Sequence, residues 1–141
     1  MIGITKIFRF ETAHAIHGYA GPCAHIHGHS YELHVCIAGN NSGLGYIEGT
    51  GIIFDFKELK TLVNEAVISK LDHKLVLSRK YIAANGTPPG EALLIFDYEP
   101  SAENLLIFIQ KQITKVLPGH IQLISLRLWE TPDSYAEWLS S

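Results

Sequence analysis

Alternating apolar and polar residues predict two strands near the start of the chain. In residues 2–11, the apolar side chains fall mainly on one parity, with Ile7 as the interruption. Every odd-numbered residue from Tyr31 to Ile37 is apolar, in a segment that begins at Ser30. A period of two residues is typical of a strand with one buried face and one wet face. The segment between them, residues 12–29, contains three glycines and Pro22, and we expect it to be irregular.

Two later segments have the apolar spacing of helices. Asp55 is a suitable N-cap, and Glu58 follows it at the distance of a capping-box partner. Apolar residues then recur at helical spacing until about Leu71. A second helix is predicted from about Ala102 to Val116, with Ser101 as its N-cap.

The remaining segments complete a predicted α+β fold. Ile121–Glu130 is interpreted as a third long strand and Tyr135–Leu139 as a short terminal one, while Ser78–Glu99 is interpreted as an extended loop or hairpin. The order strand, strand, helix, helix, strand, strand predicts a four-stranded antiparallel sheet that carries both helices on one face. No repeat or linker divides the sequence, so residues 1–141 are predicted to form a single domain.

Composition narrows the class of protein. Of the 141 residues, 47% are hydrophobic and 18% are charged, and the net charge is −3, so the chain is neither a disordered tail nor a basic nucleic-acid binder. No apolar run approaches the roughly 18 residues of a membrane span. Met1 leads directly into strand-like sequence, and there are two cysteines. We therefore expect a reducing, cytoplasmic compartment.

Histidines are concentrated in one part of the chain and predict a metal site. Six of the eight fall between positions 14 and 34: His14, His17, His25, His27, His29 and His34. His27 and His29 are two apart on an extended segment and therefore point the same way. A third imidazole, from His14 on the neighbouring strand, would complete a three-nitrogen zinc site with an open fourth position. Spacing alone does not decide which three bind, and a surface pair of histidines is the alternative.

Four other residues have side chains suited to catalysis. Cys23 could be a fourth metal ligand, or a nucleophile or base beside the metal, or simply an inert thiol, an interpretation that suits Cys36 better. Asp72 and His73 could transfer protons, although a helix cap or a surface pair is the commoner outcome. Glu130 shares the parity of the apolar residues in its strand, so its carboxylate needs either a protein cation or the N–H groups of a ligand.

Taken together, these segments resemble the 6-pyruvoyl-tetrahydropterin synthase family, and most closely its 6-carboxy-tetrahydropterin synthase branch from the queuosine pathway. The resemblance rests on six motifs that follow one another along nearly the whole chain. They are Phe10-Glu11-Thr12-Ala13-His14, Cys23-Ala24-His25-Ile26-His27-Gly28-His29, Gly51-Ile52-Ile53-Phe54-Asp55-Phe56, Leu71-Asp72-His73, Pro100-Ser101-Ala102-Glu103-Asn104 and Glu130-Thr131.

The resemblance implies a role for each candidate residue. It implies that a catalytic Zn²⁺ is held by His14, His27 and His29, and that Cys23 is the general base. It implies that Asp72 and His73 relay protons. It also implies that Glu130 accepts two parallel N–H bonds from the pterin, and it assigns substrate binding to Thr131, Ser101 and Glu103 as well. The other histidines of the cluster, His17, His25 and His34, match no catalytic position.

The resemblance also implies an assembly and a reaction. The implied fold is the tunnelling fold, in which sheets join edge to edge into a barrel, as a homohexamer of two trimers with active sites between subunits. The implied substrate is 7,8-dihydroneopterin triphosphate, converted to 6-carboxy-5,6,7,8-tetrahydropterin with release of acetaldehyde and triphosphate. Ala24 stands where a folate-pathway branch would carry glutamate, which disfavours that activity. The alternatives are a 6-pyruvoyl-tetrahydropterin synthase that only eliminates triphosphate, and a non-catalytic, His-rich zinc-binding protein of the same fold.

Overall fold

Six strands form one mixed sheet. The computed structural model describes residues 1–40, 45–90 and 92–141. The strands are β1 (Ile4–His14), β2 (His27–Gly39), β3 (Lys74–Ser78), β4 (Leu93–Phe96), β5 (Ile121–Thr131) and β6 (Ser134–Leu139). Their order across the sheet is β4-β3-β1-β2-β5-β6. The pairs β1–β2, β2–β5 and β5–β6 are antiparallel, whereas β3 runs parallel to both β1 and β4.

The prediction of a four-stranded antiparallel sheet was therefore wrong at one edge. The segment 78–99 is not a loop or hairpin, because helix α3 (Arg79–Asn85) follows β3 directly and leads into β4. Parallel neighbours need a crossover connection, and α3 supplies it. Both added strands are short, with five and four residues, so neither is long enough to give a clear period of two.

The two long strands extend further than predicted, and this brings the histidines into the sheet. The structure pairs β1 with β2 as far as His14 opposite His27, so the irregular connection covers only residues 15–26. Backbone hydrogen bonds hold this end of the ladder although its side chains are largely polar. The metal-ligand candidates consequently occupy regular strand positions.

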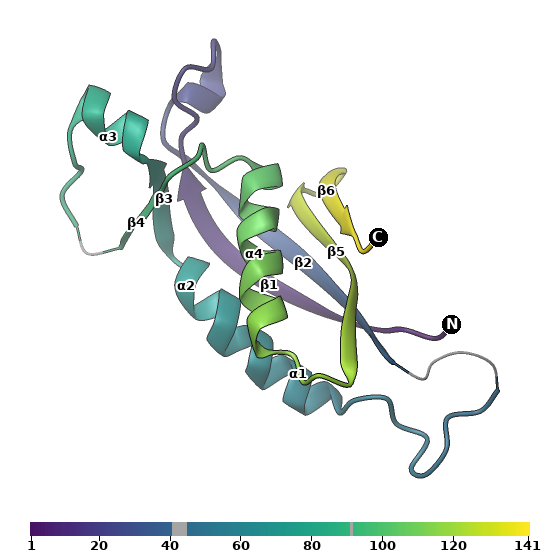
Figure 1. Cartoon of the computed structure of the whole chain (residues 1–141). Coiled ribbons are helices and arrows are strands. Elements are labelled where there is room, and N and C mark those ends of the chain that lie inside the picture. The colour runs from purple at the N-terminus through teal and green to yellow at the C-terminus, as the bar shows by residue number, and fades with distance from the viewer. Residues whose placement is uncertain (41–44, 91) are drawn as a thin grey trace.

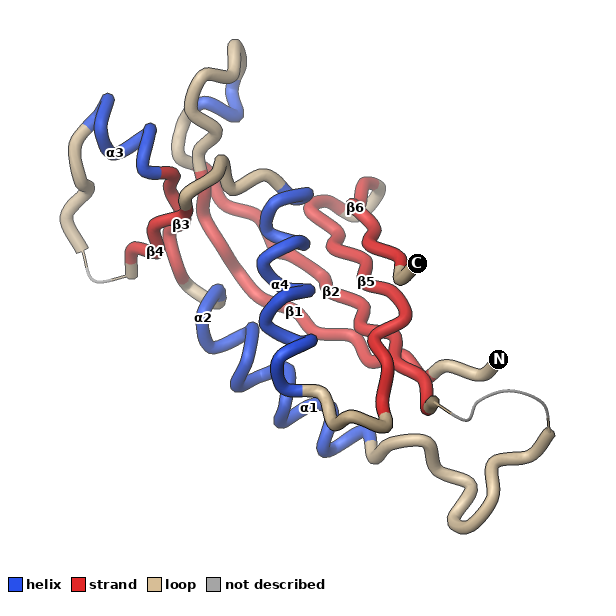
Figure 2. The backbone as a smooth tube through the Cα atoms, in the orientation of Figure 1, coloured by secondary structure: helices blue, strands red, loops and turns tan. Residues whose placement is uncertain are grey.

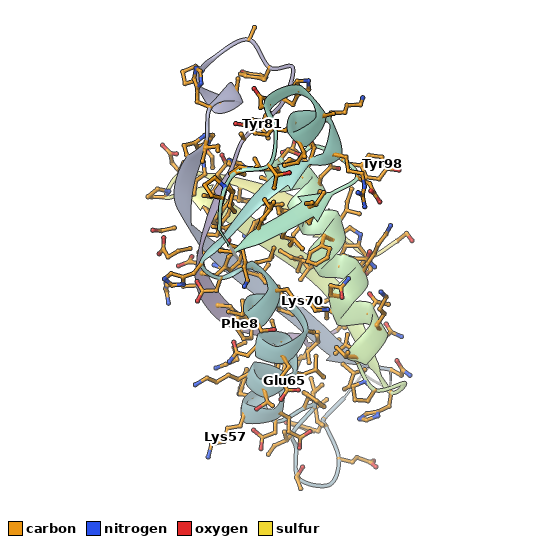
Figure 3. All side chains as sticks on the ribbon, turned by 90° about the vertical axis from the view of Figure 1, so that its left-hand side faces the viewer. Phe8, Lys57, Glu65, Lys70, Tyr81 and Tyr98 are labelled. Carbon is orange, nitrogen blue, oxygen red and sulfur yellow. The ribbon has the colours of Figure 1, made fainter. Side chains whose placement is uncertain are left out.

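Two helical segments lie on one face of the sheet, as predicted (Figures 1 and 2). The first begins at α1 (Phe56–Val63), continues through a π-helical turn at Asn64–Ile68 and ends at α2 (Ser69–Leu71). The second is α4 (Ala102–Val116). Lys57, Glu65 and Lys70, labelled in Figure 3, are exposed residues of the first segment.

Predicted N-caps begin both segments. The Asp55 side chain accepts the Lys57 N–H at 2.7 Å, and the Ser101 hydroxyl accepts the Asn104 N–H at 3.2 Å. The apolar core lies between these helices and the sheet. It includes Phe10, Leu33, Val35, Leu59, Val63, Leu105, Ile109, Leu126 and Leu128. Among the described residues, no helix is long and apolar enough to cross a membrane.

Candidate metal centre

Three histidines and one glutamate meet at the end of the core face. One ligand atom from each of His14, His27, His29 and Glu130 lies within 4.8 Å of the other three. His27 and His29 point to the same side of β2, and His14 is the cross-strand partner of His27. The strand register therefore brings together the three histidines that the resemblance assigned to the metal.

Backbone carbonyls fix the orientation of two of these rings. Nδ1 of His14 lies 2.6 Å from the Pro100 carbonyl oxygen, and Nδ1 of His27 lies 2.7 Å from that of His25. A carbonyl oxygen only accepts, so each Nδ1 carries the proton and donates it. Metal-binding histidines in proteins are commonly held in this way, with the second nitrogen left for the metal.

The Nε2 atoms of His14 and His27 face each other, and in the neutral rings neither of them carries a proton. His14 Nε2 and His27 Nε2 are 3.0 Å apart. Two tetrahedral zinc ligands at the usual Zn–N distance are about 3.3 Å apart. Two lone pairs this close repel each other unless a cation lies between them. Burial lowers the pKa of His14, whose side chain is almost fully enclosed, so a proton on that ring is disfavoured.

His29 completes a donor set that fits a metal ion. Its Nε2 is buried and makes no hydrogen bond within the described residues. Glu130 Oε1 lies 3.0 Å from this nitrogen, close enough for an ion pair but not aligned as a hydrogen bond. Three imidazole nitrogens and a carboxylate are a set that zinc and related transition metals accept. The residues present therefore fit a metal ion.

Two cavities border this group. The first, about 600 Å³, is lined by residues that include Tyr31, His29, Glu130 and Thr131. The second, about 420 Å³, is lined by residues that include His29 and His73. His29 borders both cavities. Substrate-sized space therefore adjoins the four clustered residues His14, His27, His29 and Glu130, called the metal group below, on two sides.

The Asp72–His73 pair lies at the end of α2, where the backbone turns into β3. Asp72 Oδ1 is 3.0 Å from His73 Nδ1 and also accepts the Glu11 N–H at 2.9 Å. The Glu11 amide, followed by His73, lowers the pKa of Asp72. An ionised carboxylate at hydrogen-bond distance holds the imidazole in one orientation, which suits a group that transfers protons.

The backbone of His73 is held in an unusual conformation. Its φ is 59°, in the left-handed region that a residue with a Cβ rarely adopts. Two hydrogen bonds hold the backbone turn at Asp72 and His73, called the Asp72–His73 corner below. The His73 N–H donates to the Glu11 carbonyl at 2.6 Å, and the buried Thr12 hydroxyl donates to the Leu71 carbonyl at 2.7 Å. The His73 side chain is 79% exposed and is therefore accessible to a ligand.

Cys23 lies apart from the metal group in this chain. It belongs to a short 3-10 helix, Pro22–Ala24, in the connection between β1 and β2. Its carbonyl accepts the Ile16 N–H at 2.8 Å, its side chain is half-buried, and it is not among the four clustered ligands. The connection also contacts α3, since the His17 ring lies against Tyr81 and the His17 N–H donates to the Glu99 carboxylate at 2.7 Å.

The sequence comparison decides the family. A profile described as 6-pyruvoyl tetrahydropterin synthase matches residues 3–140. The chain belongs to this family. Its members are enzymes. The resemblance inferred from the sequence motifs is thereby confirmed.

Relatives within the family have closely matching lengths. The chain is 29% identical to the 6-carboxy-5,6,7,8-tetrahydropterin synthase of Haemophilus influenzae, with 98% of this chain and 99% of that protein covered. It is 28% identical to the enzyme of the same name from Rickettsia felis, with 97% and 99% covered. The chain therefore spans essentially the full length of both relatives.

Solved structures support the same fold. The 6-pyruvoyl tetrahydropterin synthase of Caenorhabditis elegans superposes with a TM-score of 0.72 at 17% identity, over 99% of this chain and 96% of that one. The enzyme of the same name from Plasmodium falciparum gives 0.68 at 20% identity, over 97% and 96%. The tunnelling fold of the subunit is thus shared, including both helical segments on one face.

Besides Glu130, three residues were predicted to bind the substrate: Thr131, Ser101 and Glu103. They occupy different places in the structure. Thr131 lines the larger cavity beside Glu130, and its hydroxyl donates to Asp133 at 2.9 Å. Ser101 caps α4 through its hydroxyl. Glu103 is exposed in the first turn of α4 and lines neither cavity. Only Thr131 is adjacent to the metal group.

The remaining histidines of the cluster lie outside the metal group. His25 is exposed and contributes only its carbonyl, which accepts the His27 Nδ1–H. His34 is on the opposite face of β2, where its Nε2 is 2.8 Å from Glu32. With His17 in the connection beside α3, none of the three belongs to the four clustered ligands.

Two parts of the candidate site were not predicted from the sequence. The Pro100 carbonyl orients His14, and no side-chain pattern reveals a backbone acceptor. Tyr31 follows His29 on the same face of β2, and its buried hydroxyl has no hydrogen-bond partner among the described residues. Burial, with a smaller effect of Glu130, raises the pKa of Tyr31, so the hydroxyl remains protonated and available as a donor. Tyr31 has the same parity as His27 and His29 along the strand, and this pattern could have identified it as a neighbour of the site.

Proposed function

We propose that this protein converts 7,8-dihydroneopterin triphosphate and water to 6-carboxy-5,6,7,8-tetrahydropterin, acetaldehyde and triphosphate, with a bound Zn²⁺. The observation that carries the proposal is the pair of facing Nε2 atoms of His14 and His27, with His29 beside them, in a chain whose relatives are named for this product. A cation at this point removes the repulsion and leaves the adjoining cavities for the substrate.

The metal supplies Lewis-acid chemistry when it is bound, by polarising oxygens of the substrate side chain. The protein's own contribution begins with orientation. His14 and His27 are fixed by their carbonyl partners, so both nitrogens are presented without reorganisation. Enclosure of His14 keeps its ring neutral, as a metal ligand must be.

Glu130 and Thr131 recognise the pterin in this proposal. The Glu130 carboxylate accepts two parallel N–H bonds from the amino-pyrimidine edge of the ring, an arrangement that is shorter and stronger than neutral hydrogen bonds. Both residues line the larger cavity, whose volume of about 600 Å³ is enough for a small bicyclic ligand. Ser101 and Glu103 are assigned to the substrate only through their family motif.

Proton transfer is divided between two sites. Cys23, as the thiolate, removes a proton from the substrate side chain. His73 returns a proton elsewhere on the substrate, and Asp72 stabilises its protonated ring from 3.0 Å. The cavity shared by His29 and His73 supports a substrate that reaches from the metal to this corner.

Assembly is the final part of the proposal. Cys23 belongs to a connection that stands apart from the metal group of its own chain. We therefore place the complete active site between subunits, in a cytoplasmic homohexamer of two trimers. Edge-to-edge joining of sheets into a barrel also removes strand edges that would otherwise promote aggregation.

Product analysis tests the proposed function. The purified, zinc-loaded protein is incubated with 7,8-dihydroneopterin triphosphate under anaerobic conditions, and the pterins are identified by mass. A 6-carboxy product supports the proposal. A 6-pyruvoyl product would assign the chain to the triphosphate-eliminating reaction. An unchanged substrate would favour a non-catalytic zinc-binding protein.

A further inference from the structure

The Glu130 carboxylate cannot be at the metal and at the far edge of a pterin ring at the same time. In this structure it is with the metal group: its oxygen lies 3.0 Å from His29 Nε2 and within 4.8 Å of the other two ligand nitrogens. A bound pterin whose side chain reaches the metal has its amino-pyrimidine edge a full ring away. The position seen here is therefore that of a metal ligand.

Glu130 lies on the core face of β5, on the same side as the histidines, at a break in the pairing with β6. Between β5 and β6, Trp129 pairs with Tyr135 and Thr131 pairs with Ser134, which leaves Glu130 as the extra residue between them. This is a β-bulge, a feature that re-aims a side chain and frequently adjoins active sites. Because Glu130 is outside the regular ladder, its side chain can change direction without breaking a cross-strand pair.

The charge at the site also favours a carboxylate ligand. The three imidazoles are neutral donors when they bind a metal, so His14, His27 and His29 leave the full charge of a divalent ion uncompensated. Glu130 is the one acidic member of the clustered ligands. Its side chain is 27% exposed, which gives it access both to the buried histidines and to the larger cavity.

We propose that Glu130 is the fourth ligand of the metal in the substrate-free protein, and that it leaves the metal to bind the pterin when substrate arrives. The first half depends only on the metal site. The second half rests on the proposed function. Such an exchange would keep other anions off the metal until a pterin occupies the cavity, and would open the ligand position at the moment the substrate side chain reaches it.

Cobalt-loaded protein without substrate tests the first half. The visible absorption of bound Co²⁺ responds to its ligands, and azide is a small anion that binds an open position. The variants are Glu130→Gln, the shorter carboxylate Glu130→Asp, and Glu137→Gln on β6 as a control with the same change of net charge. Circular dichroism and thermal melting confirm that each variant is folded.

We expect azide to change the Co²⁺ spectrum of Glu130→Gln at concentrations that leave wild type and Glu137→Gln unchanged. Competition with a chelator should show Co²⁺ bound about tenfold or more weakly by Glu130→Gln, with Glu130→Asp between it and wild type. An equal azide response in wild type and Glu130→Gln would overturn the proposal, because the fourth position would already be open.

A reduced pterin without a side chain tests the exchange itself. Its binding is followed by quenching of tryptophan fluorescence, and it should move the wild-type Co²⁺ spectrum toward that of Glu130→Gln. Pterin binding with no spectral change would overturn the exchange. If the pterin does not bind wild type at all, the proposed function fails, while the azide result still decides whether Glu130 is a ligand.

Discussion

The metal group and the Asp72–His73 corner are built from different kinds of backbone. The three clustered histidines occupy inward positions at the ends of two paired strands, and His14 lies directly across from His27. His73 instead depends on a left-handed residue at a helix end, held by the Glu11 backbone and the Thr12 hydroxyl. Strand register brings the three histidines together, whereas several separate contacts maintain the backbone of His73.

Under the proposed function, this difference separates metal binding from proton transfer. The three histidines and Glu130 come together within one chain, but Cys23 and the Asp72–His73 pair lie outside that group. Substitutions in the strands should therefore remove the metal, while substitutions in the connections should impair turnover and leave the metal bound.

The largest effect is expected from His27→Ala. Loss of one of three nitrogens should reduce bound zinc from about one ion per chain to a small fraction and abolish product formation. The matched control is His25→Ala in the adjoining connection, which keeps the backbone carbonyl that accepts the His27 Nδ1–H. Metal analysis after dialysis measures both. Equal zinc content in the two variants would contradict the assignment of His27.

A large effect on turnover alone is expected from Cys23→Ala. Removal of a general base typically costs about a hundredfold to ten-thousandfold in rate, so kcat should fall in that range while zinc content stays at the wild-type level. Cys36→Ala on β2 is the control for loss of a thiol. Comparable kcat values in the two variants would show that Cys23 takes no part in proton transfer.

A smaller effect, with a pH dependence, is expected from Asp72→Asn. The lowered pKa of Asp72 means that its stabilising contribution is present above the ordinary value of 3.8 and is lost as pH falls through the lower folded value. At neutral pH the variant should therefore be less stable than wild type, by about 1 kcal/mol or a few degrees in Tm.

The difference in Tm should shrink as pH falls below the ordinary value of 3.8, because Asp72 takes up a proton first in the unfolded chain and only at lower pH in the folded one. Thermal melting of both proteins from pH 3 to pH 7 measures it. The kcat of Asp72→Asn should fall by about tenfold or more at neutral pH, because His73 loses its anionic partner. A constant Tm difference across the whole range would contradict the role assigned to the ionised side chain.

Much of the fold could be predicted because long, periodic segments dominate it. The helix from Ala102 to Val116 was predicted with its cap, and the strand from Ile121 ends within one residue of its predicted boundary. The β3–α3–β4 segment was not predicted, because its strands are too short for a clear period and its parallel pairing depends on the distant end of β1.

The candidate site, like the fold, could be predicted only in part. His27 and His29 followed from an alternation of two residues, His14 was the candidate from the neighbouring strand, and the family resemblance selected these three among the six histidines. The parity of Glu130 placed it correctly at the edge of the apolar face. Its closeness to His29 was not predictable, because it depends on the register between β2 and β5, which local sequence does not specify. The left-handed backbone of His73 depends on contacts from β1, which local sequence does not encode.

The most direct test of the central claim is the ratio of acetaldehyde to triphosphate formed by the zinc-loaded wild-type protein from 7,8-dihydroneopterin triphosphate. Both products are measured in the same time course for wild type and His27→Ala, with a sample that contains no protein as the blank for spontaneous decay. The account predicts equal amounts of the two products, with neither formed above background by the variant. Triphosphate released without acetaldehyde would contradict it.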